Sequence, residues 1–166
     1  MKVSSYNIGV AAEAFAAGFF ARFGYNISVQ YGANQPEYDL LVEKDDLVFK
    51  VSVKGSQTGS WGLIQSYKKS NVTYHEAADM WANTHGSKTI ICLVQFSGTN
   101  KTEAPRIYLA YPGEIADRLK CSRNGNGDSI LYENHTWKSG IAFGTTEKLP
   151  EHWQFSEERI NQLIQV

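Results

Sequence analysis

The chain has 166 residues, of which 42% are hydrophobic, 13% aromatic and 20% charged. This composition excludes a disordered tail, a coiled coil and a collagen-like chain, and it is enough for one domain with a sizeable core. The 16 basic and 17 acidic residues give a formal net charge of -1, so the chain has no global basic field that would attract polyanions. Any contact with nucleic acid is therefore expected from a local patch.

Residues 5–23 are predicted to form the first helix, because hydrophobic residues recur there at helical spacing and Gly24 follows as a C-terminal cap. The positions with this spacing are Ile8, Ala12, Phe15, Phe19 and Phe23. The other faces are also mostly apolar, which is typical of a buried helix. Glu13 is the one charged residue between Lys2 and Arg22, and a lone buried carboxylate costs several kcal/mol unless it is paired, protonated or bound to metal.

A two-residue periodicity follows this helix and predicts three strands joined by turns. The strands cover residues 25–31, 38–43 and 47–54, and the turns cover 32–36 and 44–46. In the third strand, alternation places Phe49, Val51 and Val53 on one face and Lys50, Ser52 and Lys54 on the other. A Gly/Ser-rich loop over residues 55–62 comes next.

The rest of the chain is predicted to mix helices and strands. In chain order these are a helix over 73–84, strands over 89–96 and 106–111, a short helix over 113–120, a loop over 122–128, a strand over 129–135 and a helix over 156–165. Ala77, Ala78 and Trp81 are expected to face inward, and Ser156 is the expected N-cap of the last helix. Because no repeat or linker interrupts residues 1–166, we expect a single α/β domain.

The sequence has no clear targeting signal and no clear pattern of metal ligands. The N-terminus lacks the order of a signal peptide, and the longest apolar stretch is too short to span a bilayer comfortably, so we expect a cytoplasmic protein without a membrane contact. Cys92 and Cys121 have no metal-ligand spacing, and the 4 histidines lie on separate predicted elements without H-x-x-x-H spacing, which argues against a zinc site.

Three polar residues occur where apolar residues are expected: Glu13 on the first helix, Asp39 at the start of an apolar strand, and Lys54 at the end of a Val-rich strand. Pairing of the two strands as a hairpin places Asp39 opposite the segment from Ser52 to Lys54, and packing of the helix on the same sheet brings Glu13 close. Two carboxylates and a lysine at one end of a sheet favour metal-assisted phosphodiester hydrolysis. The alternative is a buried Glu13–Lys54 ion pair, with Asp39 capping a turn.

Over residues 5–96 the sequence resembles the PD-(D/E)XK nucleases of the restriction-endonuclease-like superfamily. The residues that carry the resemblance are Glu13 in Gly9-x-x-x-Glu13, Asp39 in Glu37-Tyr38-Asp39, and the Ser52-Val53-Lys54 segment at the (D/E)-x-K position. The nearest groups are the archaeal Holliday-junction resolvases and a small group of intron-encoded homing endonucleases. The resemblance implies an αβββαβ core with a mixed central sheet, followed by a C-terminal extension over residues 97–166.

The resemblance also implies a DNA endonuclease that depends on Mg²⁺ or Mn²⁺. The implied metal ligands are Asp39, Glu13 and the backbone carbonyl of Val53, and Lys54 is the implied charge stabiliser. Ser52 stands where the family has an acid, which removes one carboxylate that Glu13 would replace. Because one such site per chain cuts one strand, a homodimer or a higher homo-oligomer is expected.

A binding surface is predicted beside this site, where polar and basic residues alternate with aromatic ones. Its members are Gln57, Trp61, Gln65, Lys68 and Lys69. An ordinary solvated loop is the alternative. Two other functions remain open: a catalytically degenerate nuclease-fold protein that binds nucleic acid or a protein partner, which Ser52 favours, and an α/β interaction domain without a nucleic-acid role.

Overall fold

The computed structural model describes residues 2–30 and 36–165. The predicted strand over 25–31 and the predicted turn over 32–36 therefore extend onto residues 31–35, which lie outside the described residues. Helix α1 (Ser5–Arg22) follows its N-cap Ser4, whose Oγ accepts a hydrogen bond from the Asn7 amide at 3.1 Å. The chain leaves α1 through Gly24, which has the positive φ of 84° that glycine adopts without strain.

Three antiparallel strands come next, as predicted: β1 (Asn26–Val29), β2 (Leu40–Lys44) and β3 (Leu47–Ser56). Asp45, with a φ of 54°, lies in the tight turn between β2 and β3. Helix α2 (Tyr74–Ala82) then crosses over to β5 (Ile90–Gln95), which pairs in parallel with β3. Strand β6 (Arg106–Ala110) pairs antiparallel with β5.

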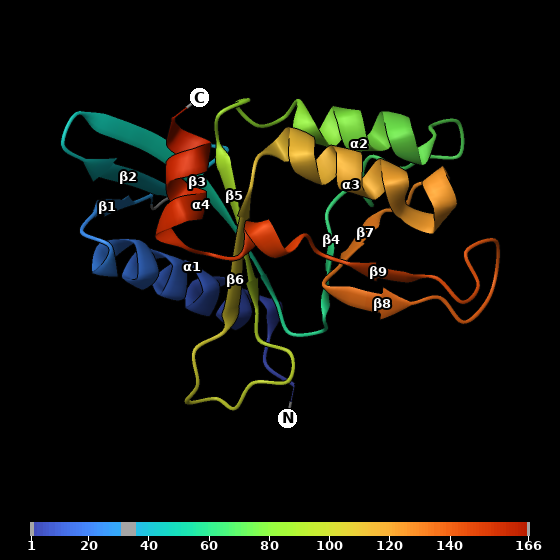
Figure 1. Cartoon of the computed structure of the whole chain (residues 1–166), viewed down its shortest axis with the longest axis horizontal. Helices are drawn as coiled ribbons and strands as arrows, with labels where there is room; N and C mark the ends of the chain where they lie inside the picture. Colours follow the sequence, from blue (N-terminus) through green and yellow to red (C-terminus); the bar gives the residue numbers. More distant parts are fainter. Residues whose placement is uncertain (1, 31–35, 166) are drawn as a thin grey trace.

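The sheet therefore has the order β1-β2-β3-β5-β6 and is mixed (Figure 1). The predicted α/β class with its αβββαβ order of core elements is confirmed. Among the described residues, no helix combines the length and the hydrophobicity needed to cross a membrane.

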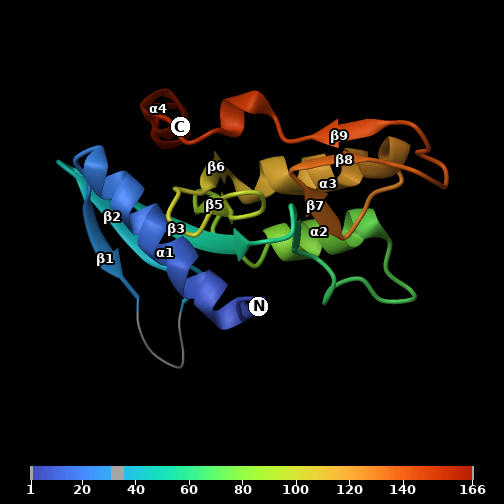
Figure 2. The same ribbon diagram turned by 90° about the horizontal axis from the view of Figure 1, so that it is seen from below.

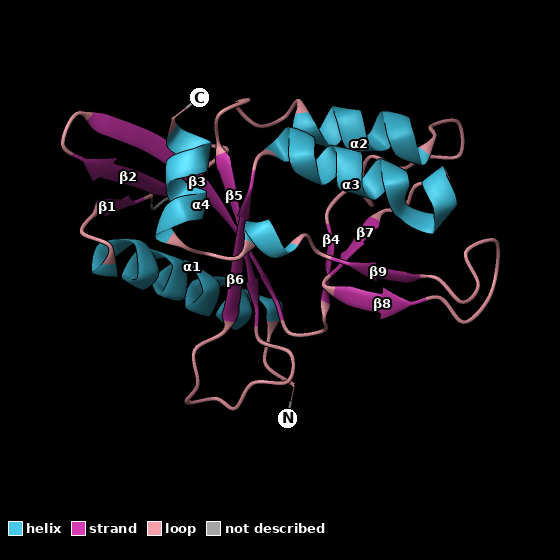
Figure 3. Ribbon diagram, in the orientation of Figure 1, coloured by secondary structure: helices cyan, strands magenta, loops and turns pink. Residues whose placement is uncertain are grey.

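The C-terminal part adds small sheets and helices beside this core (Figure 3). Its elements are α3 (Pro112–Gly125), β7 (Ile130–Tyr132), β8 (Asn134–Thr136), β9 (Thr146–Lys148), the 3-10 helix η1 (Glu151–Trp153) and α4 (Glu157–Ile164). Two predictions are corrected here. The loop predicted over 55–62 contains β4 (Ser60–Gly62), which pairs with β7, and the strand predicted over 129–135 is divided because β8 pairs with β9 instead.

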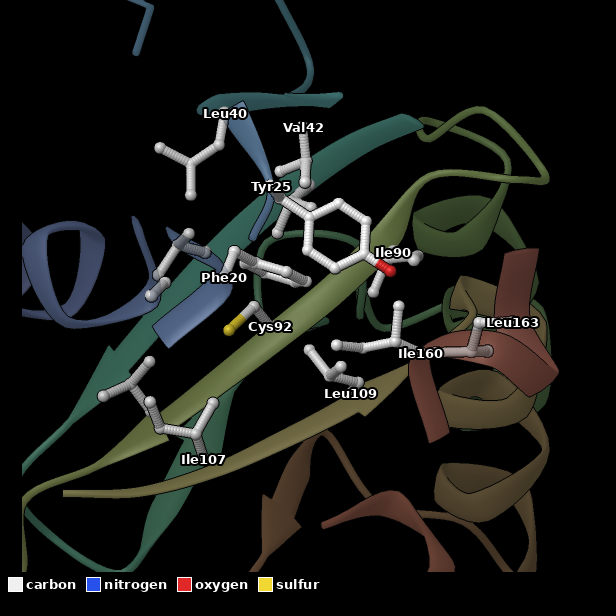
Figure 4. Close-up of a cluster of buried hydrophobic side chains, with 14 of the residues drawn as sticks. Phe20, Tyr25, Leu40, Val42, Ile90, Cys92, Ile107, Leu109, Ile160 and Leu163 are labelled. Carbon is white, nitrogen blue, oxygen red and sulfur yellow. The ribbon is translucent and has the colours of Figure 1, made fainter. Parts of the chain in front are cut away.

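The sheet separates two hydrophobic cores. Helices α1 and α4 cover one face, where Phe20, Cys92 and Ile160 pack together (Figure 4). Helices α2 and α3 cover the other face, where Trp81 and Leu119 are buried (Figure 2). The predicted alternation in β3 holds, because Val51 and Val53 belong to the core under α1.

The prediction that α1 is buried on nearly all sides is wrong. Its fully buried residues are Ala12, Ala16 and Phe20, whereas Tyr6 and Val10 are 77% and 51% exposed. Phe15, Phe19 and Phe23 are only partly buried at the edge of the core. The helix lies on the sheet through the narrow stripe of Ala12, Ala16 and Phe20, and Glu13 is beside this stripe, half-buried rather than enclosed.

Gly55 allows α1 to lie this close to β3. A Cβ atom at this position would be 2.8 Å from the Cβ of Ala12 and 3.0 Å from the carbonyl oxygen of Ile8. Gly9 lies on α1 itself, and a Cβ atom added there would have no atom within 4 Å apart from the backbone of its own helix. The two glycines therefore differ in role, because only Gly55 sets the distance between helix and sheet.

We expect Gly55→Ala to lower the free energy of unfolding by ~1–3 kcal/mol, because the added methyl group pushes α1 away from β3. Gly9→Ala is the matched control and should raise this free energy by ~0.5–1 kcal/mol through helix propensity. Urea denaturation followed by circular dichroism measures both values. A Gly55→Ala variant as stable as the wild type would contradict the close packing.

Candidate active site

Asp39 is held at the start of β2 by hydrogen bonds to β3. Its amide donates to the carbonyl of Val51 at 2.9 Å, and the pairing of Leu40 with Val51 places Asp39 beside Ser52, as the hairpin register predicted. The Val53 amide donates to Oδ2 of Asp39 at 2.6 Å. No described residue donates a hydrogen bond to Oδ1. One carboxylate oxygen is therefore fixed to the strand, and the other is available to a ligand.

Glu13 and Asp39 repel each other. The pKa of Glu13 is raised, mainly by burial and next by the negative charge of Asp39, while the positive charge of Lys54 opposes this rise. The three side chains are thus electrostatically coupled, although they come from α1, the start of β2 and β3. A carboxyl group whose pKa is shifted by burial and by specific charged neighbours is a candidate for a functional site.

The Glu13–Lys54 ion pair of the alternative interpretation is not formed. Within residues 2–30 and 36–165, the carboxylates that form salt bridges are those of Glu37, Asp79, Glu114, Glu133 and Glu151. The charge of Lys54 lowers the pKa of Glu13, but burial and Asp39 outweigh it and the pKa is raised. The carboxylate of Asp39 binds a strand amide and does not cap a turn.

A cavity of about 470 Å³ lies beside Asp39 and Lys54, whereas Glu13 is not among its lining residues and is linked to them by charge alone. Its lining includes Asp39, Ser52 and Lys54 from the sheet, together with Trp81 and Tyr67. Ser52 is only 1% exposed and brings no charge to this cavity. The alternation predicted for β3 explains the arrangement, because Ser52 and Lys54 lie on the face opposite Val51 and Val53.

The donor set suits a hard divalent cation. Among the described residues, no three His, Cys, Asp or Glu side chains are grouped as metal ligands. Mg²⁺, however, commonly takes only one or two carboxylates and keeps several waters. Within residues 2–30 and 36–165, Oδ1 of Asp39 accepts no hydrogen bond, and the pKa of Glu13 is raised by burial and, next, by the negative charge of Asp39. The oxygen atoms of Asp39 and Glu13 are donors of the kind that such an ion takes.

The residues predicted to contact nucleic acid have different environments. Gln57 donates to the Val3 carbonyl at 2.7 Å, and Lys68 Nζ lies 5.0 Å from the centre of the Tyr74 ring. Gln65 and Lys69 are exposed. Trp61 is only 3% exposed, so its ring has no free face for stacking on a base.

Trp61 instead has a structural contact. Its Nε1 donates to the Lys54 carbonyl at 2.9 Å and ties β4 to the end of β3. A tryptophan in a Gly/Ser-rich segment resembles an exposed binding residue in the sequence, but the pairing of β4 with β7 covers it. We therefore leave Trp61 out of the proposed binding surface.

Two residues that line the cavity were not predicted as site residues from the sequence: Glu37 and His85. Oε1 of Glu37 accepts a hydrogen bond from Thr89 Oγ1 at 2.9 Å, and its Oε2 is 3.5 Å from Nδ1 of His85. Glu37 could have been found from its position two residues before Asp39 in an extended segment. His85 could not, because it follows α2 and reaches the cavity only through the crossover between β3 and β5.

The charge coupling gives a direct test of this geometry. We expect Asp39→Asn to lower the pKa of Glu13, because it removes a negative charge that disfavours ionisation, and Lys54→Met to raise it further. Asp46→Asn, in the turn between β2 and β3, is the matched control and should leave this pKa unchanged. Side-chain carboxyl NMR titration measures the shift. An unchanged Glu13 pKa in Asp39→Asn would show that the two carboxylates are not coupled.

Comparison with known proteins adds little to this site. No family model and no curated protein matches the chain. A solved structure described as a bacterial homing endonuclease, I-Ssp6803I, is 13% identical, with 98% of this chain and 95% of that chain covered and a TM-score of 0.49. Similarity at this level carries no functional argument, so function has to be inferred from the residues of the cavity.

Proposed function

We propose that this protein is a metal-dependent DNA endonuclease that hydrolyses phosphodiester bonds at the cavity beside Asp39 and Lys54. The observation that carries the proposal is that Asp39 and Lys54 line one cavity, with Glu13 linked to both by charge. Keeping two carboxylates near each other in this way is unfavourable for stability alone. It is favourable when a cation and a phosphate bind between the carboxylates and the lysine.

Asp39 and Glu13, with the backbone carbonyl of Val53, would hold Mg²⁺ or Mn²⁺, which would polarise a phosphoryl oxygen and lower the pKa of a bound water. The Val53 amide keeps the Asp39 carboxylate in one orientation. Lys54 lines the same cavity and offsets the negative charge that develops on the phosphate. Because Ser52 has no charge, Glu13 supplies the anionic character of the third acidic position.

DNA is the proposed partner, and contact is confined to one face. Gln65, Lys68 and Lys69 lie on the segment that leads from the cavity to α2, and Gln57, which contacts the Val3 carbonyl, is included as a further polar contact. A local patch of this kind is compatible with the net charge of -1. Cutting both strands needs two sites, so we include a homodimer or a higher homo-oligomer in the proposal.

A second candidate function rests on Ser52. The buried hydroxyl replaces a carboxylate at the third acidic position, so a protein that retains the nuclease fold but only binds nucleic acid or a protein partner is the alternative. The two candidates make opposite predictions for Glu13 and for the metal.

Purified protein should nick or cut DNA in the presence of Mg²⁺ or Mn²⁺ and stop when chelator is added, because the carboxylates and the lysine have no catalytic competence alone. Asp39→Ala should abolish cleavage. His75→Ala is the control, because His75 is exposed on α2 and contacts the Gly125 carbonyl, outside the cavity. Gel-based cleavage assays measure these rates. Cleavage that continues in excess EDTA would overturn the proposal.

Variants at the third acidic position separate the enzyme from the binder. For an enzyme, Glu13→Gln should abolish cleavage, whereas Ser52→Ala should cost little beyond weaker metal affinity. For a binder, neither change should alter function, but Lys54→Ala, Lys68→Ala and Lys69→Ala should each weaken DNA binding. Each lost phosphate contact should reduce the slope of log K against log salt by about one unit. Fluorescence anisotropy over a salt series measures the slopes.

A further inference from the structure

His85 and Glu37 form a second pair of functional groups in the cavity that contains Asp39 and Lys54. The His85 side chain is 8% exposed, and its ring packs edge-on against Trp81 of α2, with ring centroids 5.0 Å apart. The imidazole is therefore held in place by packing as well as by its polar neighbour. The proposed metal ligands include neither residue.

A chain of contacts fixes the orientation of the imidazole. Thr89 Oγ1 donates to Oε1 of Glu37 at 2.9 Å, and Oε2 of Glu37 lies 3.5 Å from Nδ1 of His85. Oε2 and Nδ1 are both shielded from solvent, and within the described chain neither has a closer polar partner. A carboxylate facing Nδ1 favours the tautomer with its proton on that nitrogen. Nε2 then keeps its lone pair, and His85 lines the cavity.

The electrostatic surroundings keep this imidazole neutral near pH 7. Burial lowers the pKa of His85 most, the positive charge of Lys54 lowers it further, and Glu37 opposes both effects. The other titratable groups that line the cavity are Asp39 and Tyr67. Asp39 is assigned to the proposed metal and the positive charge of Lys54 disfavours a proton on His85, so His85 is the neutral base of this set.

We propose that His85 is the general base for the attacking water and that Glu37 positions the His85 imidazole. This inference rests on the nuclease function proposed above. The water oxygen forms a bond to phosphorus, and one water proton moves to Nε2 of His85. The bond from phosphorus to the leaving oxygen breaks, and that oxygen takes a proton from solvent. The imidazolium then returns its proton to solvent, which restores the base.

Single-turnover cleavage with saturating DNA and metal tests the role of His85. His85→Gln should reduce the rate by about 10²–10⁴-fold, the contribution of a general base, without changing DNA affinity. The wild-type rate should fall as the pH drops through the His85 pKa, and His85→Gln should lack this fall. His75→Gln is the matched control, an exposed histidine on the neighbouring helix, and should keep both the rate and the profile.

The pH–rate profile of Glu37→Gln distinguishes a positioning role of Glu37 from a merely structural one. The Glu37 charge raises the pKa of His85, so its removal should shift the acid limb of the pH–rate profile to lower pH. An acid limb that does not shift in Glu37→Gln would overturn the positioning role of Glu37. If His85→Gln does not fold, the position of this limb in Glu37→Gln tests the proposal in its place. A substrate with sulfur as the leaving atom should not rescue His85→Gln. Rescue would assign His85 to protonation of the leaving group and overturn the general-base role.

The two proposals fail in distinguishable ways. Absence of metal-dependent cleavage by the wild type would overturn the nuclease function and this inference with it. Wild-type cleavage that is lost in Asp39→Ala but retained at full rate, with the same pH profile, in His85→Gln would overturn only the inference.

Discussion

The site depends on the hydrogen bond from the Val53 amide to Oδ2 of Asp39, 2.6 Å long, within the register that pairs Leu40 with Val51. A shift of one residue would turn Asp39 toward the apolar face under α1 and would move Ser52 and Lys54 out of the cavity. The same register places the core residues of β2 and β3 under α1, so the packing of the core and the geometry of the site depend on one strand pairing. The close approach of α1 at Gly55 then brings Glu13 toward Asp39.

Local patterns were sufficient to predict most of the elements. Helix α1 was predictable from its capping glycine and apolar spacing, the three strands from alternation, and α4 from Ser156, whose Oγ accepts a hydrogen bond from the Arg159 amide at 3.0 Å. The coupling of Glu13, Asp39 and Lys54 was also foreseeable, because a hairpin register and a helix packed on it depend on nearby residues. The degree of burial of α1 was not foreseeable, because the composition of the helix does not show which of its faces the sheet covers.

The remaining features could not be predicted from local patterns because they depend on pairing between distant segments. Strand β4 is short and becomes a strand only through β7, about seventy residues later, so the burial of Trp61 had no local signal. His85 reaches the cavity because α2 crosses over between two parallel strands, and the contact from Thr89 to Glu37 joins the start of β5 to the segment before β2. Both features depend on the tertiary arrangement, which periodicity in one sequence does not specify.

In the proposed function, Glu13 and Asp39 together bind a divalent cation, which would offset the repulsion between the two carboxylates. Calorimetric titration of Mg²⁺ and Mn²⁺ into the wild type and into Glu13→Gln, with DNA present, measures this directly. The account predicts metal binding by the wild type and clearly weaker binding by Glu13→Gln. No binding by the wild type at millimolar metal would contradict it.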